Sequence, residues 1–600
     1  MRLFNDTKAS AASNGVKEQL QSVKNSLSRH FSVRGIESIE SLPRTFSPAE
    51  RAVWWFLIAA VFAASFIALN EVNRLALVEV PDRGGRLIEG SIGSPRFINP
   101  LLALSDADRD LTALVYSGLL RATASGELVP DLAESYTVSS DDLVYTAKLR
   151  PDAVFQDDTP VTVEDVLFTI DLAKDPAIKS PKRPNWDGIT IEKTDERTLR
   201  FVLRQPYAPF PENLTLGILP KHLWGAVAPE EFPLSSLNIE PIGSGPYQIS
   251  RVERDKNGIP TRYELSSFER FALGEGYLPR LTVRFYGNED ELMNAWNHGD
   301  VDSISGISSG SISKLVGDAR IERFPLPRVF AVFMNQNQAP LFAHKEVRQA
   351  LDRALNKETL VQEVLGGYGT ALQGPIPPGT FAYRAATLAS GNIGEAKDIL
   401  RTAGWTENPE TRTWEKKAAK KNQPPETLRF SLATSNAPEL KAAAEIIKEN
   451  WELLGVQVDL HLYETGDLQQ NVIRPRKYDA LLFGEIVGRE LDLFAFWDSS
   501  QRNDPGLNIA LYTSSAADKL LESGRTLLRQ NERAQKYQAF EKEVVNDVGA
   551  VFLYAPDFLY IVPKNLRGFS LGSITTPSDR FSNVHEWYLE TNRVWHFFAQ

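Results

Sequence analysis

Residues 428–462 read LRFSLATSNAPELKAAAEIIKENWELLGVQVDLHL, and this stretch decides the fold. Its first part alternates apolar with polar residues, as a strand with one buried face does: Leu428, Phe430 and Leu432. Pro438 then opens a helix that Gly455 ends, and the helix has one apolar face made of Leu440, Ala444, Ile447, Trp451 and Leu454. A second strand follows, with one apolar side made of Val456, Val458, Leu460 and Leu462. A strand, a crossover helix and another strand in this order predict two parallel strands and therefore an α/β fold.

The rest of the chain also switches between the two-residue period of strands and the 3.6-residue period of helices. Alternating runs predict strands at 143–149, 199–203 and 281–285, and the short polar stretches between several such runs favour antiparallel or mixed sheet. Thr162 is the predicted N-cap of a helix that buries Val166, Leu167 and Ile170. We expect loops at 176–188, 303–313 and 407–426, the last as a solvated excursion.

Composition excludes several classes of protein. A chain of 600 residues exceeds what one core usually serves, so two to four domains are expected. The net charge is −11 and no long basic run occurs, so the chain lacks the electrostatic signature of nucleic-acid binding. Cysteine is absent, which excludes disulfides, thiolate nucleophiles, iron–sulfur clusters and lipid attachment to an N-terminal cysteine. We expect no metal and no cofactor.

A membrane signal lies near the N-terminus. Residues 52–70 read AVWWFLIAAVFAASFIALN, nineteen residues without a charge, which span about 28 Å as a helix. About fifty residues precede this run and include five acids, whereas a cleaved signal peptide has a short basic lead. A retained single-pass anchor in the lipid bilayer therefore fits better than a signal peptide, and a buried core helix is the remaining alternative.

The orientation of this anchor is nearly balanced by charge. Residues 32–51 and 71–90 each contain three Lys or Arg, so the local count is a tie. Residues 1–51 contain eight Lys or Arg, and this count favours a cytoplasmic N-terminus with the large C-terminal part outside the cytoplasm.

Catalytic motifs are weak. Seven histidines are scattered, and none lies within helical reach of another, so no zinc-protease pair exists: His30, His222, His298, His344, His461, His585 and His596. Residues 306–310 match the G-x-S-x-G string of serine hydrolases around Ser308, but they sit in a small-residue loop that favours a plain turn. Asp157 and Asp158 are adjacent carboxylates, for which we favour a solvated turn over a metal site.

A family resemblance adds to these patterns. Residues 114–176, LVYSGLLRATASGELVPDLAESYTVSSDDLVYTAKLRPDAVFQDDTPVTVEDVLFTIDLAKDP, resemble the extracellular solute-binding proteins of family 5, which are the peptide-, dipeptide- and nickel-binding components of bacterial ABC importers. IGSGPY (242–247) is similar to the family's G-[TS]-G-P-Y turn, and PLFAHKEVRQALDRALNKETLV (340–361) is similar to one of its helices. Two further stretches match the family in the same order along the chain, toward the C-terminus: NIALYTSSAADKLLESGR and VFLYAPDFLYIVPKNLRGF. The resemblance covers about residues 84–590.

The resemblance implies a two-lobe, type II periplasmic-binding-protein-like α/β fold with an extra subdomain in the first lobe, preceded by the transmembrane helix. The implied boundaries are a cytoplasmic segment 1–50, a transmembrane helix 51–70, a linker 71–83, lobe I 84–325 with the subdomain at about 100–235, lobe II 326–550, and a return to lobe I over 551–600. A ligand is expected in the cleft between the lobes.

Ligand recognition departs from the family pattern. Peptide-binding members carry a motif like G-W-x-x-D, whose aspartate pairs with the ligand's amino terminus, but here Gly488 stands at the aspartate position. Glu485, Glu490 or Asp492 could supply that carboxylate. Arg489 has a planar guanidinium whose N–H groups suit an anionic or carbonyl-bearing group of the ligand. Trp497 fits either an apolar wall of the cleft or ordinary core packing. Asn335 fits either the border of the cleft or a turn cap.

These observations predict a membrane-anchored, extracytoplasmic solute-binding protein rather than an enzyme. The expected ligand is a peptide or a related small polar solute, and the expected partners are ABC permease subunits with their ATPases. One alternative is a two-lobe sensory or adaptor ectodomain without a transporter, and a further one is a serine hydrolase that uses Ser308.

Overall fold

The computed structural model describes residues 47–386, 390–417, 424–572 and 574–595. These residues divide into a small unit, which holds the N-terminal helix and the C-terminal end, and a large unit, Pro81–Thr591. Most of the predicted cytoplasmic segment 1–50 lies outside the described residues.

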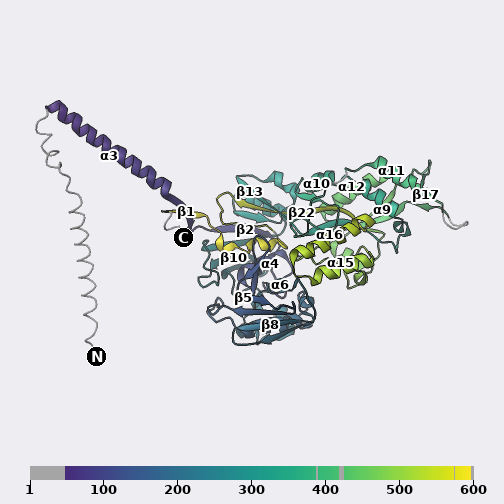
Figure 1. Cartoon of the computed structure of the whole chain (residues 1–600), viewed down its shortest axis with the longest axis horizontal. Coiled ribbons are helices and arrows are strands. Elements are labelled where there is room, and N and C mark those ends of the chain that lie inside the picture. The colour runs from purple at the N-terminus through teal and green to yellow at the C-terminus, as the bar shows by residue number, and fades with distance from the viewer. Residues whose placement is uncertain (1–46, 387–389, 418–423, 573, 596–600) are drawn as a thin grey trace. The chain divides into compact units, whose positions relative to one another are not determined.

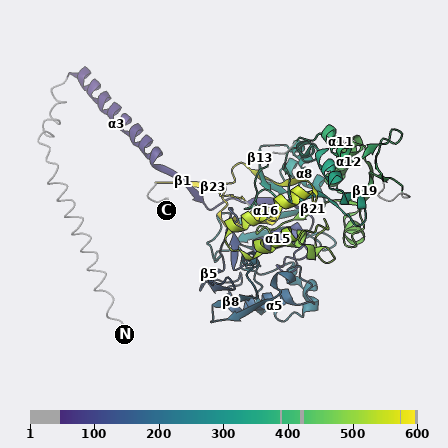
Figure 2. The same cartoon turned by 45° about the vertical axis from the view of Figure 1, so that its right-hand side comes forward.

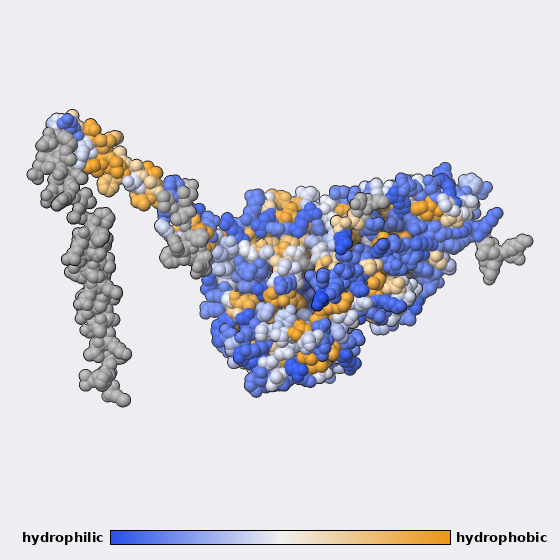
Figure 3. Space-filling model, viewed as in Figure 1, coloured by the Kyte–Doolittle hydropathy of each residue, from blue (hydrophilic) through white to orange (hydrophobic). Residues whose placement is uncertain are grey.

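Helix α3 (Pro48–Ala76) contains the predicted membrane span. Its N-cap is Ser47, whose backbone N–H and hydroxyl both donate to Glu50 Oε2 at 2.8 Å. Pro48–Glu71 is long and apolar enough to cross a membrane, none of this stretch is buried against the described residues, and apolar side chains are exposed on the face seen in Figure 3. A helix that buries none of its apolar surface in protein requires another apolar environment, and the lipid bilayer provides one.

The segment 71–83, predicted as a linker, contains regular structure. The helix continues to Ala76, and strand β1 (Leu77–Asp82) follows at once. This strand pairs with β23 (Glu590–Trp595) as a two-stranded sheet, in which Arg593 forms an ion pair with Glu79 at 3.2 Å.

The anchor leads to a first prediction. We expect the full chain to remain with membranes in alkaline carbonate and in high salt, because the apolar span holds it by burial in lipid and not by charge. A chain that begins at Pro81 should stay in the supernatant, since the large unit carries its own cores. Sedimentation and immunoblotting measure both fractions. Recovery of the full chain in the carbonate supernatant would contradict the anchor.

The large unit is built on one main sheet with the strand order β20-β19-β21-β14-β22-β12-β2-β11-β10-β9. Of these strands, β22, β2 and β10 are labelled in Figure 1. Lobe II contributes β14 (Arg328–Met334), β19 (Arg429–Ser435), β20 (Gln457–Tyr463) and β21 (Ala480–Ile486). Lobe I contributes β2 (Leu87–Ile92), β9 (Tyr247–Arg254), β10 (Pro260–Ser267), β11 (Arg280–Tyr286) and β12 (Ser303–Ser305). The long strand β22 (Val551–Pro563) belongs to both lobes.

The chain passes from one lobe to the other twice, once beside β22 and once within it. Strand β13 (Ala319–Pro325) of lobe I pairs with residues 557–563 of β22, and β14 of lobe II pairs with residues 551–554. The first crossing is therefore the short link 326–327. The return lies inside β22 near Pro556, a few residues after the predicted boundary at 551. The lobes are therefore connected by one short link and one continuous strand, and few chain crossings are typical of proteins whose domains close as a hinge.

Helices cover both faces of the lobe II sheet. Alternate residues of β14 enter two cores: Val332 and Met334 pack on one side, and Ala331 and Phe333 on the other. The first core holds α9 (Lys345–Arg353), α10 (Lys357–Leu365), α11 (Ile393–Thr402) and α12 (Pro438–Leu454), and the second holds α15 (Ser515–Thr526) and α16 (Gln530–Asp547) (Figure 2). The predicted βαβ unit is confirmed, because β19 and β20 are parallel and α12 ends at Gly455 with a φ of 100°.

The other predicted elements of lobe I are also present. An antiparallel subdomain sheet runs in the order β5-β6-β8-β7, formed by β5 (Ala133–Val138), β6 (Val144–Leu149), β7 (Ile189–Lys193) and β8 (Thr198–Leu203). Helix α5 (Val163–Lys174) has Thr162 as its N-cap and buries Val166 and Ile170. Helix α4 (Asp106–Val115) precedes the subdomain sheet in the chain, and both share one hydrophobic core.

Two predicted loops contain short strands. Within the predicted loop 303–313, β12 occupies the centre of the main sheet, where the small side chains of Ser303 and Ser305 are buried. Within 407–426, β17 (Trp414–Lys416) pairs with β16 (Thr406–Glu407) and β18 (Glu426–Thr427). The buried Trp414 donates its indole N–H to the Leu454 carbonyl at 2.7 Å, and this contact ties the excursion to lobe II.

Candidate functional site

Arg489 joins the two lobes. It follows β21 in lobe II, and its two terminal nitrogens bind acids of lobe I: Nη1 lies 2.8 Å from Glu212 Oε1, and Nη2 lies 2.9 Å from Asp579 Oδ2. Glu212 belongs to the short helix α6 (Phe210–Asn213), and Asp579 belongs to the short helix η9 (Pro577–Phe581). We call these three residues the Arg489 clasp. Burial opposes the charge of Arg489, but the two carboxylates raise its pKa above the ordinary value.

A second contact between the lobes lies beside the clasp. The Tyr207 hydroxyl donates to Asp492 Oδ2 at 3.2 Å, and Arg525 forms an ion pair with the same oxygen at 3.1 Å. The Arg525 guanidinium also covers the Tyr207 ring at 5.1 Å, and the Ala208 N–H donates to the Arg525 carbonyl at 2.8 Å. The segment 489–492 therefore packs against the subdomain of lobe I.

The clasp borders two cavities in lobe I. Cavity A has a volume of about 230 Å³ and is lined by Arg109, Thr112, Lys182, Asn185 and Trp186, among others. Cavity B has a volume of about 190 Å³ and is lined by Arg121, Asp131, His585 and Arg489, among others. They share the wall formed by Ala113, Tyr116, Glu212, Thr215 and Ser578. Arg489 is the residue of lobe II that lines cavity B.

Glycines of the Ile242–Tyr247 turn allow α4 to lie against this site. A Cβ atom added at Gly243 would lie 2.1 Å from the Val115 carbonyl oxygen, and one added at Gly245 would lie 2.6 Å from the Val115 carbonyl carbon. Any larger side chain in this turn would therefore displace the end of α4, which carries Ala113 and leads to Tyr116 in the shared wall.

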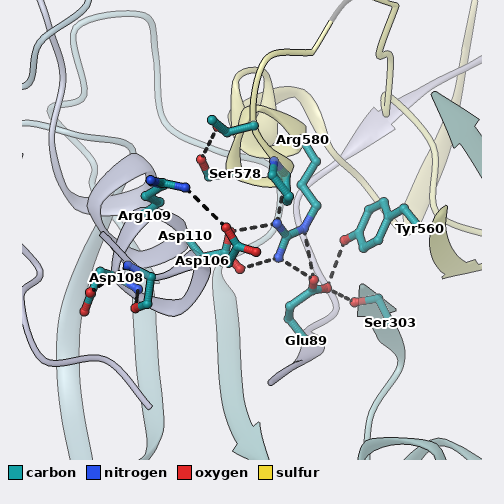
Figure 4. A network of polar contacts seen from close by, with 12 residues as sticks. Glu89, Asp106, Asp108, Arg109, Asp110, Ser303, Tyr560, Ser578 and Arg580 are labelled. Carbon is teal, nitrogen blue, oxygen red and sulfur yellow. Dashed lines mark hydrogen bonds and ion pairs between the residues drawn. The ribbon is translucent and has the colours of Figure 1, made fainter. Parts of the chain in front are cut away.

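A buried charge network fixes the lobe I side of the clasp (Figure 4). Arg580 directly follows Asp579, and its guanidinium binds Asp110 of α4 at 2.6 and 2.7 Å and Glu89 of β2 at 2.9 and 3.1 Å. Glu89 also accepts hydrogen bonds from Tyr560 of β22 and from Ser303 of β12. The network joins η9 to the helix that borders both cavities. It thereby holds Asp579 where Arg489 meets it.

The five predicted ligand-binding residues fall into two groups. Arg489 and Asp492 lie at the contact between the lobes, each with partners from lobe I. Glu485 and Trp497 are buried in lobe II, and burial raises the pKa of Glu485 well above its ordinary value. Asn335 is buried as a turn cap: its side-chain oxygen accepts from the Asn337 and Gln338 N–H groups at 3.0 and 3.3 Å.

Residues of lobe I complete the site, and the sequence analysis did not find them. Glu212 and Asp579 are 277 and 90 positions away from Arg489 in the chain. Glu212 belongs to no motif, and Asp579 belongs only to a helix capping box with Thr576, which indicates a helix start and not a site. Only the family turn at 242–247 pointed to this region. The space in front of Gly488 is open, because an added Cβ would meet no atom within 4 Å.

Ser308 does not have the setting of a hydrolase nucleophile. A three-residue strand precedes it and a short 3-10 helix follows, whereas the motif requires a strand and an α-helix. Its N–H and hydroxyl both donate to Glu289 Oε1, at 2.8 and 2.7 Å. The adjacent acids at 157 and 158 diverge: Asp157 contacts His222 at 2.6 Å, and Asp158 pairs with Arg270 at 2.8 Å.

We predict that Ser308→Ala lowers the free energy of unfolding by about 0.5–1.5 kcal/mol, because one hydroxyl hydrogen bond is lost while the N–H bond remains. Thermal denaturation measures this change. Hydrolysis of nitrophenyl esters should equal the buffer blank for both proteins. An esterase activity that disappears with Ser308→Ala would restore the hydrolase hypothesis.

Comparison with known proteins agrees with this architecture. Residues 127–505 match the model of the bacterial extracellular solute-binding proteins, family 5. The chain belongs to this family. Its members are binding proteins, and this family 5 chain has their two-lobe, type II α/β fold.

Relatives match over nearly their whole lengths. The oligopeptide-binding protein AppA of Bacillus subtilis is 25% identical over 546 residues, which are 89% of this family 5 chain and 97% of AppA. The probable D,D-dipeptide-binding periplasmic protein DdpA of Escherichia coli is 24% identical, over 85% of this chain and 96% of DdpA. Among solved structures, NikZ of Campylobacter jejuni in complex with Ni(L-His) is 26% identical with a TM-score of 0.67, covering 84% of this chain and 99% of NikZ.

Proposed function

We propose that this chain captures a peptide or a related small polar solute between its lobes and delivers it to an ABC import permease. Helix α3 anchors the chain in the cytoplasmic membrane, with the N-terminus in the cytoplasm and the lobes outside. Relatives named for oligopeptides, D,D-dipeptides and a nickel–histidine complex support this class of solute. The contact that carries the proposal is the Arg489 clasp, because it joins both lobes over polar cavities.

The cavities have the chemistry that a polar solute requires. Their walls combine charged side chains with hydroxyl and amide groups, and aromatic side chains such as Tyr116 and Trp186 provide apolar surface. Such a wall binds a solute by hydrogen bonds and excludes water when the lobes close. We test the proposal by screening the large unit against a library of two- to nine-residue peptides for a rise in melting temperature, followed by calorimetry. One bound peptide per chain supports it, and a library without a single hit contradicts it.

We further propose that Arg489 stabilises the closed state of the cleft. Both of its terminal nitrogens are engaged by the protein's own acids, and these ion pairs form only when the lobes meet. A solute held by the closed state binds more weakly when that state is less populated. We expect Arg489→Ala to weaken binding by about 1.5–3 kcal/mol, or roughly 10- to 150-fold, the range of charge-assisted hydrogen bonds.

Calorimetry with a peptide from the library measures this change. Arg529→Ala is the matched control, because Arg529 is an exposed arginine of lobe II whose ion pair within the described residues is with its neighbour Glu532, and it should leave the affinity unchanged. Equal affinity of Arg489→Ala and the parent would contradict the closing role. A loss that disappears for the C-terminally amidated peptide would instead show that Arg489 binds a ligand carboxylate.

A further inference from the structure

Two opposite charges face cavity B without forming an ion pair. Arg121 lies on strand β3 (Leu120–Ala122), and Asp131 follows strand β4 (Leu128–Pro130). Within the described residues no ion pair within 4.0 Å joins them. Asp131 is only 5% exposed, and its Oδ1 is buried without a hydrogen-bond partner; the Nε of Arg121 is in the same state. Both side chains line cavity B, so this pair of opposite charges is suited to a ligand that carries one positive and one negative group.

The neighbouring groups in the wall of cavity B leave Arg121 and Asp131 as the charged side chains that can bind a ligand. Burial raises the pKa of Asp131 to about 6, despite Ser117, Arg121 and Arg150, which lower it, so its carboxyl is mainly ionised at neutral pH. His585 is also buried in this wall, and burial lowers its pKa to about 4, so it is neutral. The Tyr116 hydroxyl is a further buried polar group without a hydrogen-bond partner in the wall that the two cavities share.

Arg489 brings lobe II to the edge of this space. It lines cavity B while its two terminal nitrogens hold Glu212 and Asp579, which line the same cavity. The volume of about 190 Å³ accommodates a small polar group. Tyr116 lies in the wall that the two cavities share, so the remainder of a solute has cavity A beside it.

We propose that cavity B binds an α-amino-acid head group of the captured solute, with its ammonium group on Asp131 and its carboxylate on Arg121. Both contacts are then charge-assisted, and such hydrogen bonds are about twice as strong as those a neutral amide would make. An ammonium and a carboxylate on one carbon match the two charges. The inference rests on the proposed function, because it names the solute class of the same interlobe site.

Two isomeric dipeptides test this inference on the full chain in detergent. γ-L-Glutamylglycine carries the ammonium and a carboxylate on one carbon, whereas α-L-glutamylglycine, with the same atoms and net charge, does not. We expect calorimetry to give at least tenfold tighter binding of the γ isomer. Arg121→Gln and Asp131→Asn should each reduce the affinity for the γ isomer at least tenfold. Arg270→Gln, at an exposed arginine of lobe I, is the control and should change neither isomer.

A third variant tests the inference independently, in case Arg121→Gln or Asp131→Asn fails to fold. Ser582 lines cavity B, so Ser582→Leu fills the space and keeps both charges, and it should remove the preference for the γ isomer. Equal or tighter binding of the α isomer, or unchanged γ affinity in Arg121→Gln and Asp131→Asn, would overturn the inference. If library peptides bind while neither isomer does, the inference fails and the proposed function stands. If no peptide and neither isomer binds, both fail.

Discussion

Arg580→Met is expected to lower the free energy of unfolding by about 3–5 kcal/mol, the loss that follows when one partner of a buried ion pair is removed. Arg580, Glu89 and Asp110 are almost completely buried, and one guanidinium serves both carboxylates. Without it, two carboxylates remain in the core of lobe I. The pKa of Asp110 is already raised by burial, so this carboxyl would be protonated more readily in the variant.

Chemical denaturation of the large unit measures this loss. Arg270→Met removes an exposed ion pair with Asp158 in the same lobe and should change the free energy of unfolding by less than about 1 kcal/mol. The triple variant Arg580→Met, Glu89→Gln, Asp110→Asn should recover part of the stability, because no unpaired charge remains. An Arg580→Met variant as stable as the parent would show that the network does not hold η9 and α4 together.

Trp497→Ala should also lower the free energy of unfolding by about 3–5 kcal/mol, because it leaves a large cavity in the core of lobe II. Trp497 is fully buried and packs against four aromatic side chains: Phe333, Tyr512, Phe540 and Phe552. Trp497→Phe retains most of this packing and should be destabilised less. The peptide affinity of the remaining folded molecules should stay close to that of the parent.

The same variant decides between the two roles of Trp497 that the sequence left open. If Trp497 were an apolar wall of the cleft, Trp497→Ala would unfold at nearly the parent's denaturant concentration and would bind peptide much more weakly. Denaturation and calorimetry on one protein sample separate these outcomes.

Local patterns predicted the elements of the fold well. The alternation at 428–432, the opening Pro438 and the closing Gly455 gave the βαβ unit that the structure contains. These features are local, because each depends on the period of apolar residues or on the backbone conformation of one residue. The strands at 406–427 were missed because they are only two or three residues long, and the contacts of Trp414 with distant residues stabilise them.

The site was less accessible to sequence reasoning. The chemistry of Arg489 indicated a carboxylate partner, but its partners come from the same chain and lie far away in it. Glu485 and Trp497 looked like ligand groups because they flank the family's recognition segment. Both faces of the lobe II sheet are covered by helices, however, and the side chains of Glu485 and Trp497 lie buried beneath them. Contacts between lobes depend on tertiary geometry that no local period records.

Native mass spectrometry of the full chain, released gently from its own membranes, tests the central claim most directly. We predict a mass excess of one small polar solute per chain, which is lost on denaturation and present in a smaller share of Arg489→Ala molecules. If the chain shows only its own mass in every preparation, whether the cells grew on peptide-rich medium or on other media, the result would contradict solute capture between the lobes.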